Sequence, residues 1–129
     1  IKLSPSDVAL YMEAGKNFAA AQKHREAANR YAVAAKLAPD SLQAHFLCGL
    51  EWGRDNQPSA AAKEFLDAVR IRPDLAETHL NLGMAYLNAG NLTNSLAEFD
   101  DALQKSPTNA LALQYDRLVR EKLSAKANP

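Results

Sequence analysis

The prolines of this 129-residue chain recur at a fixed spacing. Pro5, Pro39, Pro73 and Pro107 stand 34 residues apart. Because proline makes up about 5% of an average protein, four preassigned sites would all be proline by chance about once in 10⁵ chains. The spacing therefore indicates that one structural unit is used several times.

Other residue types keep the same period. A glycine is followed three residues later by an aromatic residue, in the pairs Gly15 and Phe18, Gly49 and Trp52, and Gly83 and Tyr86. A small residue follows at Ala27, Ala61 and Ser95. A second aromatic residue follows at Tyr31, Phe65 and Phe99, and an alanine at Ala34, Ala68 and Ala102. These columns divide the chain into three full units flanked by shorter segments: 1–7, 8–41, 42–75, 76–109 and 110–126.

Each unit contains two stretches in which apolar side chains recur three and four residues apart. This spacing fits two amphipathic helices and does not fit the alternation of a strand. We expect the paired helices to be joined near the segments QKH, NQP and AGN, where Asn56, Pro58 and Gly90 are local breakers. Each 34-spaced proline should end a second helix, and the next helix should be capped by Asp7, Ser41 or Asn109.

The repeated glycine lies inside the first predicted helix, where it costs about 1 kcal/mol relative to alanine. We predict that it allows close packing, with the glycine beside facing alanines and the aromatic residues filling the wider gaps. The alternative, that the glycines are hinges, does not explain an aromatic residue at fixed spacing.

Composition excludes several classes of protein. The 15 basic and 15 acidic side chains cancel, so the charge pattern of a protein that binds nucleic acid or an anionic membrane is missing. No apolar run is long enough to cross a bilayer. The single cysteine, Cys48, excludes an internal disulfide framework and leaves the compartment open.

The columns of apolar, glycine, aromatic, small, aromatic, small and proline residues resemble the tetratricopeptide repeat family over nearly the whole chain. The resemblance implies an all-α, right-handed solenoid of three helix-turn-helix repeats with a capping helix over 110–126. The chain departs from the family pattern at His45 and His79, where tryptophan is frequent, and at Ser95, which replaces an alanine.

The two ends of the array should differ. Asp116, Arg117 and Arg120 occupy sites that are apolar, glycine and aromatic in the repeats, so we expect this face of the last helix to meet water. An apolar set should still cover the third repeat: Leu111, Ala112, Tyr115, Leu118, Val119 and Leu123. We expect Ile1 and Leu3 to close an upstream repeat, the alternative being a short N-terminal arm.

In such a solenoid the first helix of each repeat lines a concave groove, and the resemblance implies that a peptide or helical segment of a partner protein binds there. The expected groove residues are Glu13, Lys16, Gln43, Leu47, Leu50, Arg54, Glu77, Asn81, Met84, Asn88, Tyr115 and Leu118. Leu47, Leu50 and Met84 would form its apolar centre, the alternative being that they only pack between repeats.

Some family members grip a partner's C-terminal carboxylate with a clamp of lysine, asparagine and arginine. The matching positions here are Met12, Lys16, Leu47, Glu77 and Asn81, and none carries the clamp residue. Binding of chaperone tails through that clamp is therefore disfavoured.

The histidines are interpreted as structural. Equivalent sites on adjacent helices lie about 8–10 Å apart, too far for His45 and His79 to share one metal ion, so we expect both to be packed. His24 should be solvated. No nucleophile and base occur at an interpretable spacing, so we predict neither catalysis nor a metal or other cofactor.

The sequence thus favours a non-enzymatic scaffold that assembles or localises a multiprotein complex. Two alternatives remain. In the first, the chain is a recruiting or regulatory domain of a larger enzyme. In the second, it associates with further copies of itself through its uncapped N-terminal end.

Overall fold

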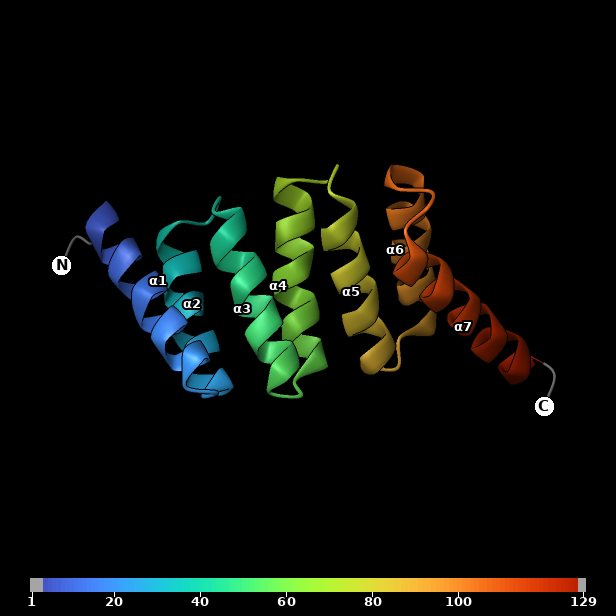
Figure 1. The fold of residues 1–129 in the computed structure, drawn as a ribbon, viewed down its shortest axis with the longest axis horizontal. Helices are drawn as coiled ribbons and strands as arrows, with labels where there is room; N and C mark the ends of the chain where they lie inside the picture. The colour runs from blue at the N-terminus through green and yellow to red at the C-terminus, as the bar shows by residue number, and fades with distance from the viewer. Residues whose placement is uncertain (1–3, 128–129) are drawn as a thin grey trace.

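The computed structural model describes residues 4–127, which form seven α-helices and no strand. The helices stand side by side in chain order, with α1 and α7 at opposite ends of the array (Figure 1). Their bounds are α1 Pro5–Ala20, α2 His24–Leu37, α3 Leu42–Arg54, α4 Pro58–Ile71, α5 Ala76–Asn88, α6 Leu92–Lys105 and α7 Ala110–Ala127. The predicted all-α solenoid is confirmed.

Most of the predicted helix ends are observed. The second helices α2, α4 and α6 each end two residues before a repeat proline. Ser41 Oγ accepts a hydrogen bond from the Ala44 N–H at 3.1 Å, and Asn109 Oδ1 accepts one from the Ala112 N–H at 3.0 Å. Both side chains therefore satisfy backbone donors that the following helix cannot pair internally.

The expected start of the first helix is wrong. Helix α1 begins at Pro5, and Asp7 lies inside its first turn, where its carboxylate accepts a hydrogen bond from the Ser4 N–H at 2.6 Å. Proline suits the first helical position because its φ is already helical and its missing N–H would have no partner there. The predictions for Ile1 and Leu3 concern residues outside the described range.

The predicted turns within the helix pairs share one geometry. Gln22, Asn56 and Gly90 occupy equivalent positions in the three repeats and have φ of 62°, 59° and 84°. In each turn the residue after this one donates its backbone N–H to the carbonyl oxygen of the aromatic residue that follows the repeat glycine. The N to O distances are 2.9 Å for Phe18, 2.9 Å for Trp52 and 2.8 Å for Tyr86. This pattern closes the first helix of each pair with a left-handed residue.

The repeat glycines are explained by aromatic rings. A methyl group built on Gly15, Gly49 or Gly83 would lie 2.6–2.8 Å from the nearest ring carbon, which belongs to Tyr31, Phe65 and Phe99 respectively. The three rings are 0–4% exposed. The predicted close packing is present, but the partner of each glycine is the ring of the second helix and not a facing alanine.

The buried side chains form separate clusters between neighbouring helices instead of one central core. One cluster joins Ala61, Phe65 and Leu82 across α4 and α5, and another joins Phe99, Ala112 and Val119 across α6 and α7. Each helix pair therefore packs against the pairs beside it as well as within itself, as expected for a repeat array. Among the described helices, none has the length and apolar character needed to span a membrane.

The last helix corrects two predictions. Asp116 is buried rather than solvated, because it stands in the column of the fully buried Leu82, and Arg120 Nε donates to its Oδ1 at 2.7 Å. Arg117 and Arg120 are exposed, as predicted. Leu111 and Leu118 do not cover the third repeat, since they are 50% and 37% exposed.

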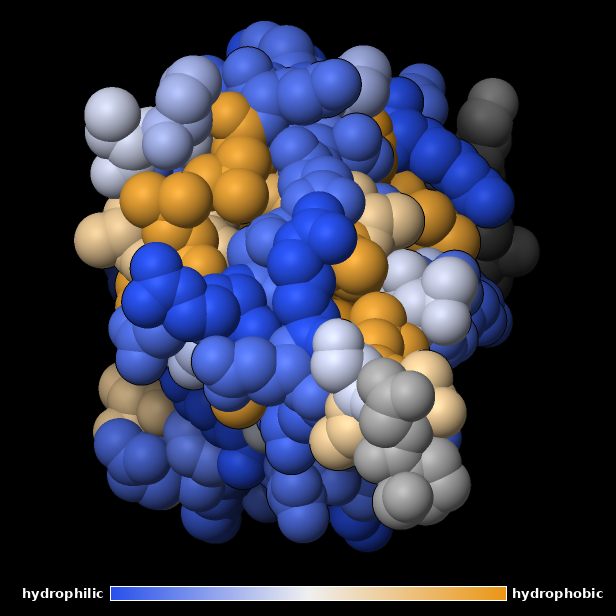
Figure 2. All heavy atoms as spheres, turned by 90° about the vertical axis from the view of Figure 1, so that its right-hand side faces the viewer, coloured by the Kyte–Doolittle hydropathy of each residue, from blue (hydrophilic) through white to orange (hydrophobic). Residues whose placement is uncertain are grey.

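The exposed apolar surface of the last helix lies at the C-terminal end of the solenoid. Leu111, Leu113 and Leu118 are its exposed large apolar side chains. Viewed from this end, apolar patches are separated by a band of hydrophilic side chains (Figure 2). The cap therefore covers the array through Ala112, Val119 and Leu123 and leaves its other leucines in water.

Substitution of one glycine in α3 tests the ring contact. Gly49→Ala should lower the melting temperature, because its methyl group would lie 2.8 Å from Phe65 Cε1 and such overpacking costs about 1–3 kcal/mol. Gly53→Ala is the matched control, since nothing lies within 4 Å of its added carbon and alanine favours the helix by about 1 kcal/mol. An equal gain in melting temperature for both variants would contradict the account.

Candidate functional site

A hollow on the first-helix face brings part of the predicted groove together. It has a volume of about 240 Å³ and lies between α3 and α5. Gly49 and Phe65, one of the glycine and ring pairs, also line it. The predicted groove residues that line it are Leu50, Arg54, Asn81, Met84 and Asn88.

The other predicted groove residues lie elsewhere. Leu47 packs in a cluster with Ala27 and Tyr31, and the Tyr115 ring stacks on Phe99 with centroids 5.5 Å apart. Leu118 is exposed on α7. The remaining four are exposed side chains outside the hollow: Glu13, Lys16, Gln43 and Glu77. The structure therefore concentrates the candidate site on the facing sides of α3 and α5.

A buried glutamate fixes one edge of the hollow. The side chain of Glu51 is 3% exposed, and Arg54 Nη1 donates to its Oε1 at 2.8 Å. His24 Nδ1 lies 2.6 Å from Glu51 Oε2, so the prediction that His24 is merely solvated is wrong. No periodic signal indicates this pair, because Glu51 shares its column with Asn17 and Ala85.

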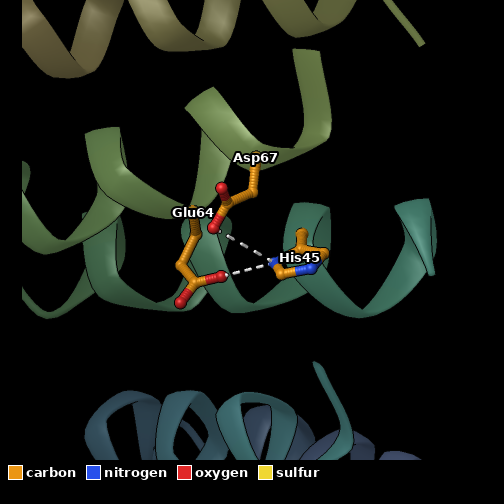
Figure 3. Close-up of side chains that lie close together, drawn as sticks. All are labelled: His45, Glu64 and Asp67. Carbon is orange, nitrogen blue, oxygen red and sulfur yellow. Dashed lines mark hydrogen bonds and ion pairs between the residues drawn. The ribbon is translucent and has the colours of Figure 1, made fainter. Parts of the chain in front are cut away.

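The histidine of the second repeat is held by two acceptors. His45 Nδ1 lies 2.8 Å from Glu64 Oε2 and 3.8 Å from Asp67 Oδ2, and Nε2 lies 2.9 Å from the carbonyl oxygen of Pro39. Figure 3 shows the ring, on α3, facing the two carboxylates of α4. Because a carboxylate and a carbonyl only accept, both ring nitrogens must carry protons for both hydrogen bonds to form.

The environment of His45 favours that charged form. Burial by itself would lower the pKa of His45, but the hydrogen bonds to Glu64 and to the Pro39 carbonyl, together with the charges of Glu64 and Asp67, outweigh it and raise the pKa. His45 as a whole residue is 8% exposed. The acidic setting of the buried His45 therefore favours the imidazolium over the neutral ring.

The third repeat contains the same arrangement. His79 Nδ1 lies 3.0 Å from Glu98 Oε2, and Nε2 lies 2.7 Å from the carbonyl oxygen of Pro73. Asp101 completes the cluster as Asp67 does in the second repeat. Sequence reasoning missed these carboxylates, although Glu64 and Glu98, like Asp67 and Asp101, stand one period apart.

Cys48 is a packing residue. It is fully buried, and burial raises the pKa of its thiol to about 12. Its Sγ donates a hydrogen bond to the carbonyl oxygen of Ala28 at 3.3 Å. A thiol in this setting is a poor nucleophile, because the thiolate is the reactive form.

Comparison with known proteins identifies the repeat. A tetratricopeptide repeat family model matches residues 51–110. The first tetratricopeptide domain of Spaghetti (RPAP3), bound to the HSP90 peptide SRMEEVD, superposes with a TM-score of 0.83 at 17% identity, covering 96% of this chain and 98% of that one. Residues 51–110 therefore match the tetratricopeptide repeat family, and the chain as a whole has the tetratricopeptide repeat fold.

Other solved structures of the repeat agree. The first domain of human RPAP3 gives a TM-score of 0.82 at 18% identity, over 97% of this chain and 98% of that one. YrrB, described as having an unusual peptide-binding site, gives 0.77 at 21% identity, over 86% of this chain and 57% of that one. A comparison with curated protein sequences finds no match.

The second and third repeats each hold a histidine at the position where tryptophan is frequent in the tetratricopeptide repeat family. His45 and His79 are both buried, and each ring connects the carbonyl of a repeat proline to a carboxylate on the following helix. Each histidine thus joins three consecutive segments of the array.

Stability should depend on the charge of His45. Since its pKa is raised on folding, its stabilising contribution is complete below the unfolded value of about 6.5 and is lost as the pH rises through the folded value. We expect urea denaturation in metal-free buffer to give a lower free energy of unfolding at pH 8.5 than at pH 6.5. His45→Gln should reduce this difference, and an unchanged difference would contradict the assignment.

Proposed function

We propose that this protein is a non-enzymatic interaction module that captures a segment of a partner protein and so assembles or localises a multiprotein complex. The observation that carries the proposal is the hollow between α3 and α5. Its centre is apolar at Leu50 and Met84, and polar side chains surround it at Arg54, Asn81 and Asn88.

The composition of the hollow favours a peptide with an apolar anchor. Leu50 and Met84 are only half-buried, so a partner side chain can remove further apolar surface from water. Methionine adapts its shape to different neighbours. An apolar hollow with a few polar groups is the usual form of a site that fixes the position of a bound segment.

The polar rim suits a peptide backbone better than a charged tail. Asn81 Nδ2 donates to the Glu77 carbonyl oxygen at 3.0 Å, which leaves the Asn81 amide oxygen to accept from a ligand N–H. The positive charge of Arg54 is already paired with Glu51. The rim therefore orients a ligand through hydrogen bonds and adds little net charge.

An acidic peptide such as the HSP90 peptide SRMEEVD bound to the Spaghetti domain is a poor fit. At 17% identity that likeness supports a shared fold and says nothing of a shared ligand. Of the positions that match the carboxylate clamp, Met12 and Leu47 are apolar and partly buried, and Glu77 is acidic. Lys16 alone offers a cation, which is too little to hold two carboxylates.

Two alternatives to a free scaffold can be tested. A recruiting domain of a larger enzyme would use the hollow in the same way, and the full-length reading frame distinguishes it from a free scaffold. Self-association draws support from Leu10, which is 67% exposed on α1. Light scattering over a range of concentrations, with Leu10→Asp as the comparison, tests that alternative.

Leu50→Glu tests the groove. Peptides are first selected from a displayed random library with the wild-type protein, and their affinities are measured by titration calorimetry. The variant should bind them at least about tenfold more weakly, because a carboxylate buried against an apolar anchor loses hydration without gaining a partner. Failure to select any peptide would count against the proposal.

Asn88→Ala is the rim control. We expect only a small change in affinity and melting temperature, because Asn88 is exposed and a hydrogen bond from it to a ligand replaces one to water. The melting temperature of Leu50→Glu must be measured beside it. A loss of binding matched by an equal loss of folded protein would show that Leu50 serves packing, and the groove proposal would be wrong.

A further inference from the structure

We propose that the two histidine and carboxylate clusters are binding sites for divalent transition-metal ions of the zinc type, with one ion in each. The first cluster is His45, Glu64 and Asp67, and the second is His79, Glu98 and Asp101. In each cluster the three ligand atoms lie within 4.8 Å of one another. This inference is independent of the groove, because it uses none of the residues that form the rim or the apolar centre.

The distances suit a single ion. In a tetrahedral site, ligand atoms about 2.1 Å from a zinc ion lie about 3.4 Å from each other. His45 Nδ1 and Glu64 Oε2 are already 2.8 Å apart, and Asp67 Oδ2 lies 3.8 Å from the same nitrogen. Glu64 and Asp67 stand three residues apart on α4 and so project from one face, toward the ring (Figure 3). Three protein ligands leave a fourth position for water, as in open zinc sites.

The backbone already orients both rings as metal ligands are oriented. A ligating histidine usually donates its other ring N–H to a carbonyl or carboxylate, which fixes the ring and directs the free nitrogen to the ion. Here Nε2 faces the carbonyl oxygen of Pro39 in the first cluster and of Pro73 in the second, at 2.9 and 2.7 Å. Nδ1 is thereby directed at the carboxylates in both.

The charge balance also favours an ion. An imidazolium with two carboxylates carries a net charge of −1. A divalent ion takes the place of the Nδ1 proton, which is released to solvent, and the neutral ring, the two carboxylates and the ion then sum to zero. The ion thus replaces a proton between the same three groups and needs no new partner.

The fold does not require these residues. In the first repeat the equivalent positions hold Tyr11, Arg30 and Val33, which cannot form such a site, and α1 and α2 still pair. The helix pair therefore forms with or without the cluster. The recurrence of all three ligands in two successive repeats needs a reason other than helix pairing, and a shared ligand chemistry supplies one.

The surrounding charges predict which site is tighter. Lys36 and Lys63 line the hollow at the first cluster, and Arg70 Nη1 lies 3.4 Å from Asp67 Oδ1. At the second cluster, 34 residues later, Ala97 stands where the first cluster has Lys63, and Gln104 stands where it has Arg70. Only the position of Lys36 keeps a cation, which is Arg70. The second cluster has fewer neighbouring cations, so its ion should be held more tightly.

Calorimetric titration of the metal-free protein with Zn²⁺ tests the proposal. We expect two ions per chain, and Co²⁺ should give the visible absorption of a nitrogen and oxygen site. Glu98→Gln should weaken the tighter site by at least about tenfold while its amide oxygen keeps the hydrogen bond from His79. Asp101→Asn should do the same without altering the His79 and Glu98 pair, so a folding defect in one variant leaves the test intact.

Glu121→Gln and His24→Gln are the matched controls, and both should retain two ions. Glu64→Gln should weaken only the second, weaker binding event. Absence of binding at millimolar Zn²⁺, or binding that survives both Glu98→Gln and Glu64→Gln, would overturn the proposal. Loss of binding in His24→Gln would also overturn it by placing the ion on that histidine.

Discussion

The structure depends on one contact, the aromatic ring of a second helix seated against a glycine of the first. In all three repeats the ring lies where any side chain on that glycine would need to be. The contact lets the two helices of a pair approach closely at one point and fixes their relative position. In the second repeat it has a further consequence, because Gly49 and Phe65 also line the hollow that we assign to partner binding. The packing unit and the candidate site are therefore built from the same residues.

Most of the fold could be predicted from the sequence because it follows from local preferences that recur. The left-handed turns at Asn56 and Gly90 and the cap at Ser41 each depend on a residue type acting on its own backbone. Repetition makes such weak preferences decisive. The start of α1 at Pro5 differs from the prediction because proline is compatible both with the end of one helix and with the first turn of the next.

What could not be predicted depends on tertiary partners. The charge of Asp116 predicts that it meets water. The buried Ala112 and Val119 determine how α7 packs, however, and Asp116 is buried with them. Arg120 then compensates the buried carboxylate. Likewise, periodicity placed Leu47 and Leu50 on one side of α3 but could not tell that Leu47 packs beside Tyr31 while Leu50 lines the hollow.

The carboxylates that face His45 and His79 are another tertiary feature that could not be predicted. The two histidines are recognisable in the sequence because they stand at equivalent positions of two repeats. The carboxylate partner of each lies nineteen residues away on the next helix, and the only signal for it is that Glu64 and Glu98 are also one repeat apart. The groove and the clusters then use different sides of the helices: Leu50 lines the hollow, while His45 of the same helix faces α4. One helix can thus serve two kinds of ligand without sharing residues.

The proposed function requires that the partner binds in the hollow between α3 and α5. The most direct test is to follow the backbone amide signals of the labelled protein by nuclear magnetic resonance as a selected peptide is added. The account predicts that the largest shifts cluster in α3 and α5, around Leu50 and Met84. Largest shifts in α2 and α6, which supply none of the residues that line the hollow, would contradict it.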